Sequence, residues 1–308
     1  MMDAVSRLSQ GLINGLVLGS VYALIALGYS MVYGVLRILN FAHGEVFMVC
    51  SFAGWLLISA LGGDDARLHP ALLLSSVLAL SMAAGAALGL AVERVAYRPH
   101  RKSGRLAPLL SAIGVSIFLQ NVVMLATQGR VRTVPTGWLV EGRGTIAFGS
   151  VTVPFTGVLI LAVSTVLTMG LQFVVRRTRA GRMMRAVSED MECASYVGIP
   201  VDRVIAFTFA LGSALAGAAG VLVSLYYTQV DFAMGFSAGM KAFTAAVLGG
   251  IGSLPGAVLG GLVLGIAESL GTIMVAPVYK DAIAFGILIL ALVVRPNGIL
   301  GENVQEKV

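Results

Sequence analysis

Long apolar segments separated by short polar ones are the dominant pattern along this chain. Seven of them have about 20 residues, the length that a hydrocarbon core of about 30 Å needs, and we count Asp281–Val294 as an eighth and last span. These predicted spans are Gly11–Tyr33, Ala42–Leu61, Pro70–Val92, Leu106–Ala126, Val153–Val175, Val204–Tyr227, Pro255–Val275 and Asp281–Val294. A short polar lead, Met1–Gln10, is expected before the first span. The pattern predicts an all-α fold, a polytopic integral membrane helix bundle forming a single domain over residues 1–308.

The stretch before the seventh span is less regular. Thr228–Gly239 reads as a loop, and Met240–Ile251 is apolar but too short to span alone. We therefore expect a ninth, short or re-entrant segment there. Thr127–Thr152 carries Gly and Pro throughout, which is typical of a connection between spans.

The composition agrees with a membrane protein. Of the 308 residues, 57% are hydrophobic and only 12% are charged, whereas a soluble domain carries about 25% charged residues. The ten-residue alternating strands of a membrane β-barrel are not the pattern seen here.

Basic residues are concentrated in two clusters, Arg94–Arg105 and Arg176–Arg203. Basic loops face the cytosol, so both clusters and Arg37 are predicted inside and Thr127–Thr152 outside. The C-terminus is then inside only if Met240–Ile251 counts as a crossing. The clusters lack interleaved aromatic residues and a soluble domain, which argues against nucleic-acid binding.

Small residues recur four positions apart within the predicted spans. In lipid such stripes let helix backbones approach closely, so we expect them to be packing faces rather than the lining of a pathway. The stripes are Gly11, Gly15, Gly19 and Ala23; Gly85 and Gly89; and Gly252, Gly256 and Gly260.

Catalytic and metal-binding patterns are missing from the sequence. The three histidines and two cysteines show no metal-ligand spacing, and neither GxSxG nor HExxH occurs. A nucleotide-binding P-loop is also missing. We therefore expect no metal, no cofactor and no enzymatic activity of its own.

Polar side chains at membrane depth are costly and mark candidate positions of a translocation path. His43 and Glu45 follow Arg37 closely, so they could be a solvated helix start with Asn40 as N-cap, or part of the path. Lys241 and Glu268 could form a structural ion pair or contact a substrate. The candidate path residues are Asn14, Asn40, His43, Glu45, Asn121, Lys241 and Glu268.

The segment Arg176–Arg203 is the longest highly charged run of the chain. Its basic part predicts a turn at Gly181, and apolar residues at three- and four-residue spacing from Met184 onward predict an amphipathic helix. Ser188 is a candidate cap for a second short helix, and Gly198 followed by Pro200 ends the pattern. The alternative is a solvated loop with incidental helix.

Several stretches carry a resemblance to a known family. The sequence ECASYVG, Glu192–Gly198, resembles the EAA-xxx-G coupling motif of ABC importer permeases, with Cys193 in place of the first Ala. Five longer stretches look like the LivH-type permease of branched-chain amino-acid ABC importers. They are Asn14–Glu45, Glu93–Pro99, Ser111–Asn121, Asp202–Phe209 and Gly239–Glu268, so that the resemblance covers nearly the whole chain.

The resemblance implies an ATP-driven importer of Leu, Ile and Val in the bacterial cytoplasmic membrane. The implied partners are a LivM-type permease, two cytosolic ABC ATPase subunits, an external substrate-binding protein and membrane lipid. The implied ATPase-coupling residues are Arg185, Glu189, Asp190, Glu192, Ala194 and Gly198. A related family that handles urea or short amides is the alternative. An ion-coupled secondary carrier is disfavoured because no evident ion site occurs.

Overall fold

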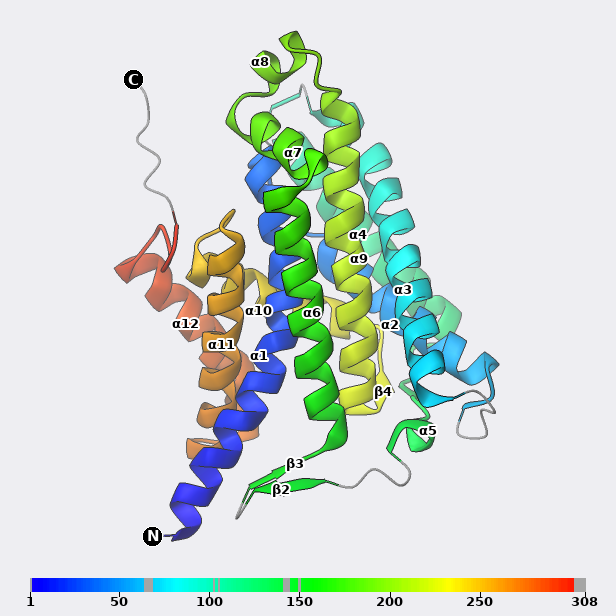
Figure 1. The fold of residues 1–308 in the computed structure, drawn as a ribbon, viewed down its shortest axis with the longest axis vertical. Helices are drawn as coiled ribbons and strands as arrows, with labels where there is room; N and C mark the ends of the chain where they lie inside the picture. Colours follow the sequence, from blue (N-terminus) through cyan, green and yellow to red (C-terminus); the bar gives the residue numbers. More distant parts are fainter. Residues whose placement is uncertain are drawn as a thin grey trace.

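The computed structural model describes residues 2–63, 69–101, 103–104, 106–140, 145–148 and 151–301. In this part eight helices are long and apolar enough to cross a membrane, which confirms the predicted fold class (Figure 1). They are α1 (Met2–Leu36), α2 (His43–Ala60), α3 (Pro70–Val92), α4 (Leu106–Thr127), α6 (Phe155–Arg177), α9 (Val201–Tyr227), α11 (Leu254–Met274) and α12 (Lys280–Val294), the last continuing the 3₁₀ turn Pro277–Tyr279.

Short elements lie at the two ends of the bundle (Figure 1). One end carries α7 (Arg179–Glu189) and α8 (Met191–Tyr196), which make up most of the predicted cytosolic segment. The opposite end carries the antiparallel pair β2 (Ile146–Phe148) and β3 (Val151–Val153) and the helix α5 (Gly137–Val140). The short strand β1 (Arg132–Thr133) pairs antiparallel with β4 (Gln229–Val230). The predicted external connection therefore lies at the end opposite to the cytosolic segment.

The polar lead predicted for Met1–Gln10 is wrong, because α1 already begins at Met2. Its 35 residues extend for about 52 Å, well beyond a bilayer core. Gln10 donates to the carbonyl of Thr152 and accepts from its N–H, both at 2.9 Å. The strand β3 thus satisfies the polar side chain that looked like part of a loop.

The short ninth segment exists as α10 (Met234–Gly249), and it begins six residues before the predicted Met240. The loop prediction for Met234–Gly239 is wrong because Gly235 and Gly239 let this turn lie directly against the backbone of α2 at Gly44. Its 16 residues extend for about 24 Å, less than a full span.

The end of α10 lies at the same end of the bundle as the end of α1, because Gly252 lies against Gly34. The N–H groups of Ile299 and Leu300 donate at 2.9 Å to the carbonyls of Leu248 and Gly249. The described C-terminal turn is therefore on the cytosolic side. This is the side that we expected if the short segment, now α10, counts as a crossing.

The packing interpretation of the small-residue stripes is confirmed. Gly15, Gly19 and Ala23 of α1 lie against the backbone of α11 around Gly261 and Gly265. Other stripe members bring further helix pairs together: Gly85 and Gly89 lie against Ser213 of α9, and Gly256 and Gly260 lie against Gly249 and Ala245 of α10.

The stretch between α1 and α2 re-enters the bundle, so the predicted interfacial position of Asn40–Glu45 is wrong. Arg37 turns the chain with a φ of +53°, and His43 then packs against Gly28 of α1, which itself lies against Gly212 of α9. Gly28 lies 8 residues from the cytosolic end of α1, so His43 is about 12 Å deep.

Asn40, His43 and Glu45 are all buried, with at most 2% of their surface exposed, which excludes a solvated helix start. The prediction of Asn40 as N-cap is also wrong. Ala42 occupies that position, and Asn40 Oδ1 accepts from the Ala42 N–H at 3.2 Å. Non-helical backbone is tolerated at this depth because protein surrounds it.

Candidate coupling segment and membrane-buried polar sites

The helix α7 is fixed to the end of α6. The hydroxyl of Thr178 caps α7 by accepting from the Gly181 N–H at 3.2 Å. A Cβ on Gly181 would collide with the carbonyl of Val175, and the Arg185 guanidinium donates to that same carbonyl. The turn predicted at Gly181 is therefore wrong, because the glycine lies inside a helix that needs it for close approach.

The helix α8 is defined at both of its ends. Asp190 Oδ1 accepts from the N–H groups of Cys193 and Glu192, each at 2.8 Å, and these bonds lower the pKa of Asp190 below its usual range. Gly198, with a φ of +85°, ends the helix as a left-handed C-cap. The cap predicted at Ser188 is wrong, because its hydroxyl donates to the carbonyl of Arg185.

Most of the implied coupling residues are exposed at the tip of the molecule. Glu189, Glu192 and Gly198 face solvent, whereas Ala194 is buried beneath α8. Two residues that sequence reasoning missed, Tyr196 and Val197, are 78% and 76% exposed. The sequence did contain a signal for this exposed surface, since two bulky apolar residues stand directly before a glycine in a largely polar segment.

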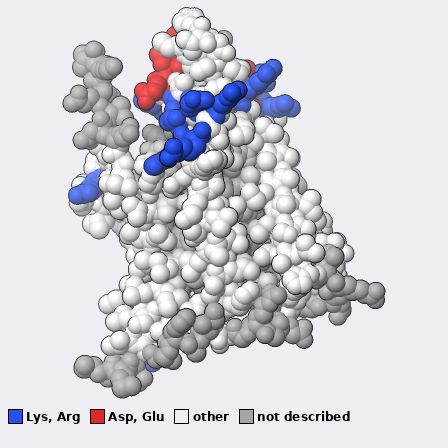
Figure 2. Space-filling model, in the orientation of Figure 1, with Lys and Arg blue, Asp and Glu red and all other residues white. Residues whose placement is uncertain are grey.

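Charge separates the tip from the membrane-spanning part. Figure 2 shows Lys and Arg side chains in a band just below the tip, acidic side chains beside them, and an uncharged surface over the middle of the molecule. This band is where positive-inside logic places the cytosolic membrane surface. The tip formed by α8 therefore projects beyond that surface.

An ionic network joins the start of α9 to the end of α3. Asp202 accepts from Arg98 and from Arg101, each at 2.8 Å. Arg101 also pairs with Glu93, which is only 1% exposed. Glu93 begins a π-helical turn, Glu93–Tyr97, of a kind that frequently marks functional sites.

The π-helical turn leads from this network to the buried start of α2. Tyr97 is fully buried, and its hydroxyl contacts the carbonyl of Leu39 at 3.0 Å and Asn40 Oδ1 at 3.2 Å. Further into the membrane, Ser116 of α4 donates to Glu45 Oε1 at 3.4 Å. Three of the candidate path residues, Asn40, His43 and Glu45, therefore lie in one buried region connected to the cytosolic network.

Lys241 and Glu268 form a second buried polar site. Lys241 Nζ lies 2.9 Å from Glu268 Oε1, and the Tyr22 hydroxyl donates to Glu268 Oε2 at 2.9 Å. Lys241 also pairs with Asp281 at 3.0 Å, whose side chain is 64% exposed. Both oxygens of the buried carboxylate are thus bonded, and the ammonium links it to an open carboxylate at the start of α12.

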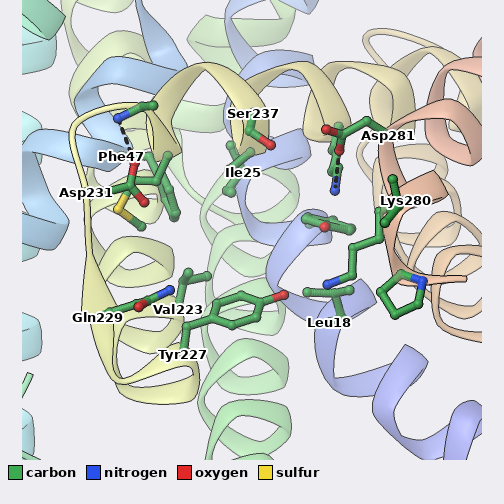
Figure 3. Close-up of a pocket in the computed structure, with 17 residues that line it drawn as sticks. Leu18, Ile25, Phe47, Val223, Tyr227, Gln229, Asp231, Ser237, Lys280 and Asp281 are labelled. Carbon is green, nitrogen blue, oxygen red and sulfur yellow. Dashed lines mark hydrogen bonds and ion pairs between the residues drawn. The ribbon is translucent and has the colours of Figure 1, made fainter. Parts of the chain in front are cut away.

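A cavity of about 410 Å³ opens beside this pair (Figure 3). Its wall includes Lys241, Asp281 and Lys280, and on other sides Tyr227, Asp231 and the apolar side chains of α1, α2 and α9. The volume lies within the range of about 300–1,000 Å³ that is usual for small-molecule sites.

The remaining two path candidates lie apart from both sites. Asn14 is half-buried on α1, where its Oδ1 accepts from Gln10 at 3.0 Å. Asn121 is exposed on α4 and donates to the carbonyl of Ile117 in its own helix at 2.8 Å. Within the described residues, no group of three or more His, Cys, Asp or Glu could hold a metal ion.

Comparison with known proteins finds relatives that match this chain over nearly its full length and that carry the same functional description. Residues 11–292 match the family described as branched-chain amino acid transport system, permease component. The chain is 46% identical over 310 residues to the high-affinity branched-chain amino acid transport system permease protein BraD of Pseudomonas aeruginosa, covering 100% of both chains. It is 46% identical over 305 residues to the corresponding permease protein LivH of Escherichia coli K12, covering 97% of each.

A more distant relative is the probable branched-chain amino acid transport permease protein LivH of Methanocaldococcus jannaschii, 27% identical over 94% of this chain and 91% of that protein. These matches agree with the eight membrane-spanning helices of the described residues. The chain belongs to the family of branched-chain amino acid transport system permease components, as a multi-pass membrane subunit of an ABC transporter.

Proposed function

We propose that this chain carries Leu, Ile and Val inward across the bacterial cytoplasmic membrane as one membrane subunit of an ATP-driven importer. Its partners would be a LivM-type permease, two cytosolic ABC ATPase subunits and an external substrate-binding protein. The substrate class is supported by the names of the relatives that are 46% identical over the full length. Because the sequence contains no P-loop, ATP hydrolysis would belong to the partners.

The exposed tip of α8 is the observation that carries this proposal. Tyr196 and Val197 expose apolar surface beyond the basic band, next to the carboxylate of Glu192. Exposed bulky apolar residues on a rigid helix are typical of a protein–protein contact. We assign this surface to an ATPase subunit, with Glu189 and Gly198 at its edge.

Force applied to α8 would reach the membrane through rigid elements. Only the turn Val197–Pro200 separates α8 from α9, so a push on the tip moves the start of α9. Asp202 at that start is bound to Arg98, which directly follows the π-helical turn, and to Arg101, which pairs with Glu93 at the start of that turn. Such a chain of hydrogen bonds and packed helices is a physical route for alternating access between two global states.

The two buried polar sites are the proposed positions along the translocation path within this subunit. Lys241 and Glu268 lie beside the cavity, whereas Asn40, His43 and Glu45 lie nearer the cytosolic side. Polar groups at this depth are commonly part of substrate routes.

The proposal is tested by ATP-dependent uptake of labelled leucine into vesicles holding the complete transporter and its binding protein. Glu192→Lys and Gly198→Pro should abolish uptake while the protein remains inserted, because they alter the docking surface and the end of α8. Arg177→Gln, an exposed change on α6, is the matched control and should retain uptake. Normal uptake in both α8 variants, or uptake driven by an ion gradient without ATP, would contradict the proposal.

A further inference from the structure

The cavity beside α12 combines charges of both signs with aliphatic walls. Lys280 and Asp281 are consecutive at the start of α12, and both line the cavity. Across it lie Ile25, Phe47 and Val223, which form an apolar wall (Figure 3). A ligand that fits this arrangement has one positive and one negative group close together and an apolar side chain extending from them.

The charged groups at the α12 side have unequal roles. Lys241 is held by the buried carboxylate of Glu268, whose other oxygen accepts a hydrogen bond from Tyr22. These three side chains therefore hold one another in place. Asp281 contacts Lys241 through Oδ1 only, and its side chain is largely exposed. Lys280 makes no ion pair with any residue in the described part of the chain, and its side chain extends into the cavity toward Tyr227 (Figure 3). The Lys280 ammonium and the second oxygen of Asp281 are therefore both available to a ligand, from two consecutive residues on the α12 side of the cavity.

We infer that this cavity binds a zwitterionic aliphatic amino acid, with its α-carboxylate on Lys280, its α-ammonium on Asp281 and its side chain against Ile25, Phe47 and Val223. The inference rests on the proposed function and adds the place where the substrate is held. The ammonium and the carboxylate of an α-amino acid are attached to the same carbon, so a cation and an anion on the same side of the cavity can bind both groups. Hydrogen bonds between charged groups are stronger than neutral ones and supply the orientation.

The first test is the rate of leucine uptake by the reconstituted transporter with its binding protein and ATP. Lys280→Gln should lower the maximal rate about tenfold, the usual weight of one charge-assisted hydrogen bond. This change breaks no ion pair of the described structure, so the bundle should still assemble. Arg295→Gln, an exposed change at the other end of α12, is the matched control and should keep the original rate.

The second test measures occupancy of the cavity directly. Ser237 lines the cavity (Figure 3), so Ser237→Cys in a Cys193→Ser background is labelled from outside by a charged thiol reagent. Leucine-loaded binding protein with ATP should slow this labelling at least several-fold. It should not slow labelling of Ser59→Cys, an exposed position near the far end of α2.

Either an unchanged uptake rate in Lys280→Gln or equal labelling of Ser237→Cys with and without leucine would overturn the inference. Failure of the proposed function gives a different result. In that case the unmodified transporter itself shows no ATP- and binding-protein-dependent uptake of leucine.

Discussion

The close contact between α1 and α11 allows a quantitative prediction of the effect of a mutation on helix packing. In Gly261→Ala the new Cβ would lie 2.6 Å from Ala23 Cα and 2.8 Å from Ala23 Cβ. Ordinary contacts of a Cβ begin at 3.4 Å, so the two helices must separate locally by about 0.8 Å. Because the neighbours are backbone atoms and a methyl group, no flexible side chain can move out of the way.

Overpacking of this kind costs about 1–3 kcal/mol. The separation also weakens the neighbouring close contacts at Gly15, Gly19 and Gly265, since dispersion falls steeply with distance. We therefore expect Gly261→Ala to lower the free energy of unfolding by about 1–3 kcal/mol, even though alanine favours the helix over glycine by up to about 1 kcal/mol.

The measurement is a titration from mild detergent into SDS, followed by circular dichroism of the purified protein. Gly170→Ala is the matched control, because a Cβ on that residue of α6 would meet nothing within 4 Å. The control should be unchanged or slightly more stable. Equal stability of Gly261→Ala and the unmodified protein, or equal losses in both variants, would refute the packing argument.

Three further changes test other parts of the structure. Asp190 holds the pKa of the Cys193 thiol above its usual range, so the reactive thiolate is scarce at neutral pH. Asp190→Asn should therefore lower this pKa and speed alkylation of Cys193 by iodoacetamide at pH 8, and an unchanged rate would argue against the effect of Asp190. Lys241→Met leaves Glu268 buried without its cation and should cost about 3–5 kcal/mol in the SDS titration; Lys241→Met with Glu268→Gln should recover part of the loss, and no recovery would show that the pair is not the cause. Tyr97→Phe removes the hydroxyl at the start of α2 and should lower leucine uptake more than ATP hydrolysis stimulated by the binding protein; parallel losses would point to a general defect instead.

The eight long spans were predictable because hydrophobicity over about 20 residues depends on local sequence alone. The small-residue stripes were predictable as packing faces for the same reason. Which helices they join was not, since Ala23 meets Gly261, more than 200 residues away in the chain. Pairing of that kind depends on tertiary geometry that spacing within one helix does not contain.

Part of the errors arose because polar residues were judged by their neighbours in sequence. Asn40 and His43 follow Arg37 and looked interfacial, but the chain turns back and buries them. Thr228–Gly239 looked like a loop, although Gln229 lies in the strand β4 and Asp231 Oδ1 accepts from the Ala233 N–H at the start of α10. In a membrane bundle, protein rather than water can satisfy such groups.

The short helix α10 connects the two buried polar sites and gives the cavity a physical link to the cytosolic tip. Its first turns lie against Gly44 in the start of α2, and Asn40, four residues before Gly44, accepts a hydrogen bond from Tyr97 of the π-helical turn. Its middle carries Lys241, which pairs with Asp281 at the mouth of the cavity. A helix of 16 residues that is held at both places moves as one unit. We therefore expect movement of α8 to change the separation of Lys241 and Asp281, so that the mouth of the cavity opens and closes as α8 moves.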